Sequence, residues 1–236
     1  MKALNAGILA AIILAPGANA ITLQADADAY VHGGGNSGTT NGTFNDLLVA
    51  DSSVTDDDDF VTYLRFDLSG ISGTISNATI MLTESFDFAH TITEYEINVR
   101  WLFHSQGDNW DESAITWDNA PGTPPGTTPF LGNWFIPVSA AVGDTHSFSS
   151  PSLDFLLNND LGPDQLATLV LSADQAEHAA FASREHPTLA GPTLTFAVDG
   201  QVPVPASLPL AIGALGGMAL LANRRRASLS PTRSKA

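Results

Sequence analysis

The chain has 236 residues and no cysteine. It can form no disulfide, no thiolate metal site and no cysteine nucleophile. The common catalytic motifs are missing as well: there is no G-x-S-x-G, no H-E-x-x-H and no Gly-rich phosphate loop. These absences disfavour the best-known enzyme classes. Stability has to come from an apolar core, with a bound metal as the expected additional support.

Positive charge is scarce in the middle of the chain. Residues 21–199 contain 25 acidic residues, no lysine and only three arginines (Arg65, Arg100 and Arg184), a formal charge near −22. Such a charge repels nucleic acids and anionic membrane surfaces, so we expect no nucleic-acid partner. It favours solubility in salt water and the binding of divalent cations.

The first twenty residues have the three parts of a secretory signal peptide. Lys2 supplies the positive charge, residues 6–14 form a short apolar run, and Ala18-Asn19-Ala20 is an A-x-A cleavage site. The run is too short to span a bilayer. We therefore expect residues 1–20 to be removed by signal peptidase, so that the mature protein begins at Ile21. The alternative is a buried N-terminal helix.

The other end of the chain also carries a sorting pattern. Residues 200–207 form a linker with a short motif, residues 208–226 form an apolar helix with a basic stop, and residues 227–236 are expected to be a disordered tail. The motif is Val202, Pro203, Val204, Pro205 and Ala206, and the stop is Arg224, Arg225 and Arg226. This tail resembles the PEP-CTERM sorting signal of the VPLPA type. The resemblance implies transient insertion into the inner membrane, processing by an exosortase-type enzyme and delivery to the cell surface or exopolysaccharide matrix. The alternative is an ordinary C-terminal anchor.

The middle of the chain alternates apolar and polar residues with a period of two, which is typical of β-strands. Such runs occupy residues 62–68, 78–83, 95–103 and 194–198, with clusters of turn residues between them. Each run predicts a strand with one buried face. A helix is predicted only over residues 150–157, with Ser150 as N-cap and Pro151 at the first position. The pattern predicts an all-β fold, an antiparallel β-sandwich of jelly-roll type with one short helix.

Several blocks within residues 21–199 resemble the DNRLRE domain family. They are DADAYV (26–31), YLRFDLS (63–69), ISNATI (75–80), WDESAITWDNAP (110–121), FASRE (181–185) and PTL (192–194). The two-tryptophan block is the most specific of them. The family resembles carbohydrate-binding modules, including modules attached to lyases that act on alginate-like polymers. The resemblance implies a jelly-roll sandwich that binds glycans and does not imply catalysis.

Aromatic residues and arginines are the candidate sugar contacts, because pyranose rings stack on aromatic faces and carboxylates attract guanidinium groups. Trp134 lies beside a Gly/Pro/Thr loop and is the best candidate for an exposed stacking platform. Tyr63 and Arg65 lie on the strand face opposite the expected core, where they either line a groove or are covered by other segments. Arg184 completes the candidate set, whereas Trp101 is expected in the core.

Carboxylates form three groups, and one of them suggests a metal site. Asp26 and Asp28 lie two apart on one strand face and are the candidate Ca²⁺ ligands. The run 56–59 is interpreted as a solvated acidic loop, and the third group, around the two tryptophans, is Asp108, Asp111, Glu112 and Asp118. With three arginines, the domain is poorly equipped for a polyanion. The glycan is therefore neutral, or Ca²⁺ bridges carboxylates of both partners, or the glycan role has been lost.

These observations predict a secreted, non-catalytic protein that binds extracellular polysaccharide at the cell surface or in the matrix. One alternative is a structural matrix or adhesion protein without a sugar site. A second is a polysaccharide lyase or hydrolase, for which Arg184, Glu185 and His186, with His178 nearby, would be candidates.

Overall fold

The computed structural model describes residues 20–50, 59–86, 94–122, 128–137, 139–173 and 178–199. Residues 1–19 of the expected signal peptide, residues 56–58 of the acidic run and everything from residue 200 onward lie outside the described residues. The sorting motif and the expected apolar helix fall in that last part. Among the residues described, no helix has the length and apolar character needed to cross a bilayer.

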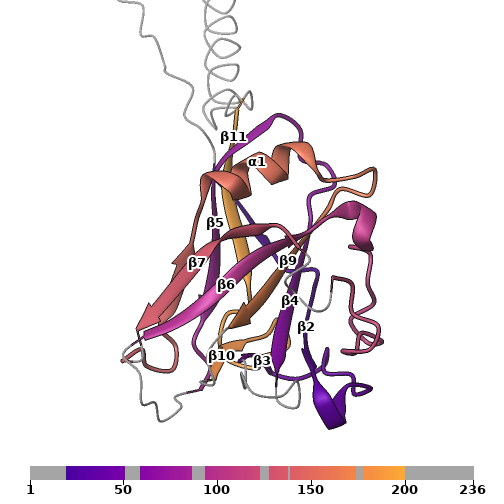
Figure 1. Ribbon diagram of the computed structural model, residues 1–236. Helices are drawn as coiled ribbons and strands as arrows, with labels where there is room; N and C mark the ends of the chain where they lie inside the picture. Colours follow the sequence, from indigo (N-terminus) through magenta and orange to yellow (C-terminus); the bar gives the residue numbers. More distant parts are fainter. Residues whose placement is uncertain are drawn as a thin grey trace, which may run out of the picture. The chain divides into compact units, whose positions relative to one another are not determined.

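Two antiparallel sheets form a sandwich (Figure 1). The first sheet has the order β1 (Ala20–Gln24), β11 (Thr193–Asp199), β5 (Thr74–Thr83) and β8 (Thr145–Phe148). The second has the order β2 (Ala27–His32), β4 (Phe60–Asp67), β9 (Leu166–Ala173), β6 (Glu94–Leu102) and β7 (Phe130–Pro137). A separate antiparallel pair joins β3 (Asp46–Val49) to β10 (Ala179–Ala182). The predicted β-sandwich of jelly-roll type is confirmed.

The four predicted strands correspond to β4, β5, β6 and β11. Their alternating apolar residues fill the core between the sheets, because every second side chain of a strand points to the same face. The fully buried members include Leu64, Phe66, Ile80, Leu82 and Trp101, so the core assignment of Trp101 is confirmed. Strand β1 was not predicted; it pairs with β11 along its whole length, from Ala20↔Ala197 to Gln24↔Thr193.

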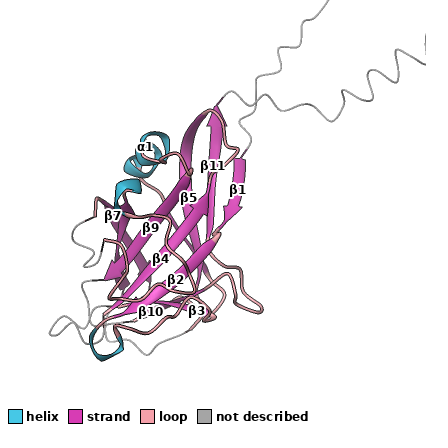
Figure 2. Ribbon diagram, turned by 90° about the vertical axis from the view of Figure 1, so that its right-hand side faces the viewer, coloured by secondary structure: helices cyan, strands magenta, loops and turns pink. Residues whose placement is uncertain are grey.

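The predicted helix is present as α1 (Pro151–Asn159). The Ser150 hydroxyl accepts a hydrogen bond from the backbone N–H of Leu153, as an N-cap does. Leu153 and Leu157 face the core. Figures 1 and 2 both place α1 at the end of the sandwich away from β3 and β10.

The prediction that each strand has only one buried face is wrong for β4. Its second face carries Val61 and Tyr63, which lie in another apolar cluster together with residues of β2 and β9. Residues 103–122 cover this face and contribute Trp110, Ile115 and Ala120. Trp110, Ile115 and Ala120 follow the 3₁₀ turn η2 (His104–Gln106). The sheet therefore has a core on both sides over β2, β4 and β9.

Candidate functional site

Arg65 and Asp26, two of the predicted site residues, are bound to each other. The Arg65 Nη2 and Nε atoms lie 2.7 and 3.0 Å from Asp26 Oδ2. Arg65 also donates from Nη1 to the carbonyl of Trp110, and its guanidinium carbon lies 5.2 Å from the centre of the Trp110 ring. These contacts neutralise and orient Arg65, so it holds the segment 103–122 against the sheet.

Asp28 is buried beside this pair, with 1% of the residue exposed. Its Oδ2 accepts a hydrogen bond of 2.9 Å from the backbone N–H of Arg184, while Oδ1 is buried without a hydrogen-bond partner. Burial raises the pKa of Asp28 to about 7, with the negative charges of Glu185 and Glu112 adding to the rise. Asp26 and Asp28 therefore do not share one site: Asp26 faces Arg65, and Asp28 faces two glutamates.

Arg184 closes the cluster. Its Nη2 lies 2.9 Å from Glu112 Oε2, its Nε lies 2.6 Å from Glu185 Oε1, and its Nη1 donates to the carbonyl of Asp26. Glu112 in turn accepts the backbone N–H of Asp28 at 2.9 Å. The sequence placed Glu112 only among the acids near the tryptophans. The cluster joins three segments that are distant in the sequence, and we therefore interpret it as a structural clamp.

A polar hollow of about 370 Å³ opens beside this clamp. Its lining residues are Asp26, Ala27, Arg65, Asn109, Trp110, Asp111 and Glu112. A second hollow of about 230 Å³ lies against the same tryptophan and is lined by Trp110, Asp111, Ala114, Ile115 and Asn119. Trp110 itself is 7% exposed, so neither hollow offers a broad aromatic surface for a sugar ring.

Two predicted sugar contacts, Trp134 and Tyr63, are corrected by the structure. Trp134 is 5% exposed and stacks on Phe181 with ring centres 6.4 Å apart inside the core between the sheets. It lies on β7 directly before the exposed Phe135, so the two side chains point to opposite faces of the strand. Tyr63 is fully buried, and its hydroxyl donates to the carbonyl of Pro121 at 3.0 Å. Neither side chain can stack on a ligand at the surface.

The outer face of β6 and β7 forms an open strip instead. It consists of Glu96 and Arg100 on β6 and of Phe130, Asn133 and Phe135 on β7, whereas Asn98, opposite Asn133, is buried. Phe130 and Phe135 are 51% and 52% exposed, and the Asn133 amide donates to Glu96 across the strands. Figure 1 shows β6 and β7 side by side at this edge of the sheet. The sequence signal for the strip was the alternation within residues 134–137, where Trp134 and Ile136 share the buried phase.

Arg100 differs from the other two arginines. Arg65 and Arg184 each pair with carboxylates, whereas no carboxylate of the described residues lies within ion-pair distance of Arg100. Its Nη1 donates to the carbonyl of Thr128 at 3.1 Å, and its guanidinium carbon lies 5.4 Å from the centre of the Phe130 ring. Its Nε is buried without a hydrogen-bond partner. The positive charge of Arg100 therefore lies beside an exposed ring and has no carboxylate partner in the part of the chain that the structure describes.

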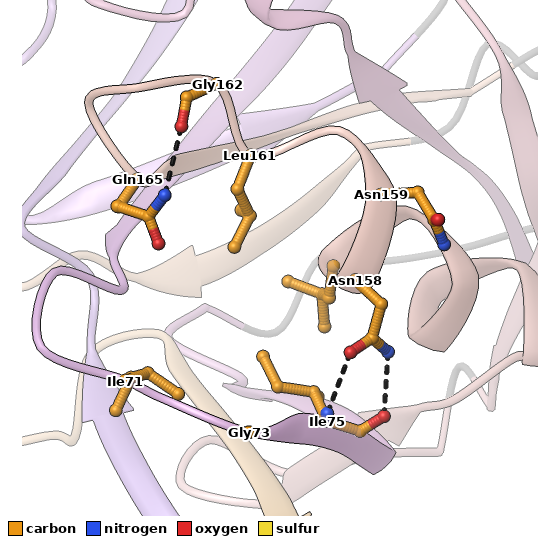
Figure 3. A pocket seen from close by; sticks show the side chains of 9 residues that line it. Ile71, Gly73, Ile75, Asn158, Asn159, Leu161, Gly162 and Gln165 are labelled. Atoms are coloured by element: carbon orange, nitrogen blue, oxygen red, sulfur yellow. Dashed lines mark hydrogen bonds between the residues drawn. The ribbon is translucent and has the colours of Figure 1, made fainter.

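A further pocket, of about 280 Å³, lies between α1 and the first sheet (Figure 3). Its polar groups are largely engaged within the protein. The Asn158 side chain accepts from the backbone N–H of Ile75 and donates to its carbonyl, both at 2.8 Å. Gln165 donates to the carbonyl of Gly162 at 3.0 Å. These bonds fasten α1 and the following loop, so we assign this pocket a structural role.

Comparison with known proteins identifies one family. The model of carbohydrate-binding module family 96 (CBM96) matches residues 19–197. No curated protein matches the sequence. One similar solved structure contains the CBM22-1 and GH10 modules of endo-1,4-β-D-xylanase 10B from Clostridium thermocellum, complexed with xylohexaose. It shares 8% identity over 76% of this chain and 27% of that chain, with a TM-score of 0.28. This chain thus spans about a quarter of that structure's length.

Proposed function

Because the chain belongs to carbohydrate-binding module family 96, we propose that it is a secreted, non-catalytic protein that binds extracellular polysaccharide. We propose the open strip on β6 and β7 as the binding surface. The observation that carries this assignment is the position of Arg100 beside the exposed Phe130, on the same strip as the exposed Phe135 and without a carboxylate partner among the described residues.

The strip suits an extended sugar chain. Phe130 lies opposite Arg100, and Phe135 lies opposite Glu96, which precedes Arg100 by four residues on β6. The two rings are therefore about 13 Å apart along the strand. Each ring can stack on the C–H face of a pyranose, and the side chains of Asn133 and Arg100 can hydrogen-bond to hydroxyl or carboxylate groups. This arrangement fits a short run of sugar units.

The charge of the domain narrows the glycan class. A formal charge near −22 repels polyanions, and Arg65 and Arg184 are already compensated by carboxylates. Of Arg65, Arg100 and Arg184, Arg100 is the one that can face a uronate without a competing carboxylate among the described residues. We therefore propose a neutral or sparsely charged polysaccharide as the ligand, rather than a fully charged uronate polymer.

The cluster of Asp28, Glu112, Arg184 and Glu185 supports a non-catalytic role. General acid–base chemistry on glycans needs carboxylates that face the substrate in a cleft. Asp28, Glu112 and Glu185 have oxygens within 4.8 Å of one another, surround Arg184 and are partly or fully buried. These carboxylates hold segments of the fold together, so they give no support to a hydrolase or lyase assignment.

Calcium binding stays a prediction, but we now propose a different set of candidate ligands. Asp26 pairs with Arg65, whereas oxygens of Asp28, Glu112 and Glu185 lie within 4.8 Å of one another. Three carboxylates fit the oxygen preference of Ca²⁺, and the ion would have to share them with Arg184. Calorimetry with CaCl₂ on chelator-treated protein tests this, and Glu185→Gln should reduce any heat of binding.

Export also remains part of the proposal. Strand β1 begins at Ala20, so cleavage before Ile21 leaves nearly its whole pairing with β11 intact. Signal peptidase and an exosortase-type enzyme are the proposed processing partners, with transient insertion of the tail into the inner membrane. Mass spectrometry of protein recovered from the cell surface should find Ile21 as the first residue and no residues beyond the VPVPA motif.

The binding proposal is tested on an array of neutral and acidic polysaccharides. The wild type should bind at least one polymer, and Phe135→Ala should weaken that binding about tenfold. Phe155→Ala is the matched control, because Phe155 is also an exposed phenylalanine but lies on α1. Equal losses in both variants would overturn the strip assignment. A wild type that binds none of the polymers would favour the structural matrix protein instead.

A further inference from the structure

A group of three metal-ligating side chains lies away from the open strip. His104 belongs to the turn η2 directly after β6, Asp108 follows it by four residues, and Asp164 belongs to the loop between α1 and β9. The Nδ1 atom of His104 lies 3.3 Å from Asp108 Oδ1 and 3.3 Å from Asp164 Oδ1. The three ligand atoms lie within 4.8 Å of one another. They converge from two segments that are far apart in the chain.

These atoms are buried, and two of them have no hydrogen-bond partner. His104 Nδ1 and Asp164 Oδ1 are inaccessible to solvent and make no hydrogen bond of good geometry. The Asp108 side chain is 3% exposed. Burying polar atoms in this way costs free energy unless a partner compensates them. A cation between the three side chains would supply that partner for all of them at once.

The local structure holds the histidine ring in place. A Cβ on Gly162 would lie 2.3 Å from Cγ and Nδ1 of His104, so a larger residue there would displace the ring. Gly162 also has a φ of 35°. In the same loop, Asp160 accepts a hydrogen bond of 2.7 Å from the Trp101 indole. The loop is thereby fixed to the core, which keeps Asp164 opposite His104.

We propose that His104, Asp108 and Asp164 bind one divalent transition-metal ion of the zinc class. One imidazole nitrogen and two carboxylate oxygens form a mixed set that suits Zn²⁺, whereas Ca²⁺ takes oxygen ligands. Water can complete the coordination, because His104 and Asp164 are about one-third exposed. In a chain without cysteine, such an ion would link the end of β6 to the loop before β9. This proposal does not depend on glycan binding.

The first experiment is calorimetric titration of chelator-treated full-length protein with ZnCl₂. We expect one tight equivalent and a rise in melting temperature. Asp164→Asn should lower the affinity at least tenfold, and because Asp164 is partly exposed this variant should fold. Asp118→Asn is the matched control: it removes an exposed acid from the segment 103–122 and should bind like the wild type.

A second measurement identifies the ligands. Co²⁺-loaded protein should show visible absorption bands that are lost in His104→Gln and in Asp164→Asn. Excess Ca²⁺ should not displace Zn²⁺. The proposal is overturned if the wild type binds no Zn²⁺, if Asp164→Asn binds as tightly as the wild type, or if excess Ca²⁺ displaces Zn²⁺. Loss of binding in Asp118→Asn as well would assign the heat to general acidity and overturn it too.

Discussion

The two halves of the outer face of the five-stranded sheet differ in what covers them. Over β2, β4 and β9, residues 103–122 pack Trp110 and Ile115 onto Tyr63. Over β6 and β7, Phe130 and Phe135 are half exposed. In the covered half the polar ends of the aromatic residues bond to the protein: the Trp110 indole donates to Thr168 at 3.2 Å and the Tyr63 hydroxyl to Pro121. The comparison teaches that the aromatic residues of the family-like blocks build the domain, whereas the less distinctive phenylalanines are available to a ligand.

The arginines at positions 65, 100 and 184 are divided between the two halves in the same way. Arg65 and Arg184 belong to the covered half and hold it closed through carboxylates, while Arg100 lies on the open half without one among the described residues. Removing a residue from the covered half should therefore change stability, and removing one from the open half should change affinity. Four predictions test this separation.

The largest effect should come from Trp110→Ala. The substitution removes the centre of the cover over Tyr63 and Thr168, and large-to-small changes of buried aromatic residues cost roughly 3–5 kcal/mol. Chemical denaturation measures the loss. Trp117→Ala serves as the comparison, because Trp117 is only partly buried against the same cluster and should cost much less. A loss below about 1 kcal/mol for Trp110→Ala would contradict a structural cover.

The next effect is a pH dependence that belongs to the covered half. The pKa of Asp28 is raised from 3.8 to about 7 by burial and by the neighbouring Glu185 and Glu112. The folded state then binds a proton more tightly than the unfolded state. The contribution of Asp28 is most favourable below pH 4, is lost as the pH rises from 4 to 7, and is constant above 7, a change of at most about 4 kcal/mol.

Asp28→Asn should remove this contribution. The side-chain oxygen can still accept the backbone N–H of Arg184, and the new amide can donate to Glu112 or Glu185. We expect the variant to be more stable than the wild type at pH 8 and no more stable at pH 4. Denaturation curves at the two values measure this in chelator-treated protein. A stability difference that is the same at both values would show that Asp28 titrates normally.

On the open half, Arg100→Gln should weaken polysaccharide binding with little effect on folding. Hydrogen bonds to a charged group contribute about 1.5–3 kcal/mol, which corresponds to roughly 10–100-fold in Kd. Arg65→Gln should show the reverse pattern, since it leaves Asp26 without its ion-pair partner and loosens the cover. Affinity electrophoresis and thermal unfolding of both variants separate the two roles. If Arg65→Gln lost affinity and Arg100→Gln lost only stability, the covered half would be the binding surface and the open half would be structural.

The smallest effect is expected for Phe155→Ser on α1. Phe155 is 64% exposed and lies on neither half of the sheet. Its replacement should change stability by less than about 0.5 kcal/mol and leave polysaccharide affinity unchanged. A clear loss of affinity would place a binding surface on α1 and would break the assignment to β6 and β7.

The strands and the helix could be predicted because they follow from local patterns. Alternation at residues 62–68 and 95–103 indicated β4 and β6, and Ser150-Pro151 marked the start of α1. The site could be predicted only in part. Asp28 and Arg184 were identified, but as a metal ligand and a sugar contact; the structure joins them as members of one clamp. Trp134 was misplaced because a nearby Gly/Pro/Thr loop suggested exposure, while its own phase with Ile136 indicated burial.

The sequence by itself determined the sheet-forming pattern, the absence of disulfides and the strongly acidic surface, because each of these depends on residue type and on neighbours along the chain. Only the tertiary structure decided which face of each strand stays open. That outcome depends on where residues 103–122 pack, and so on contacts such as Arg65 with Trp110 and Arg184 with Glu112, which join segments about 45 and 70 positions apart. No local pattern records such a contact, because its free energy exists only once both segments are in place.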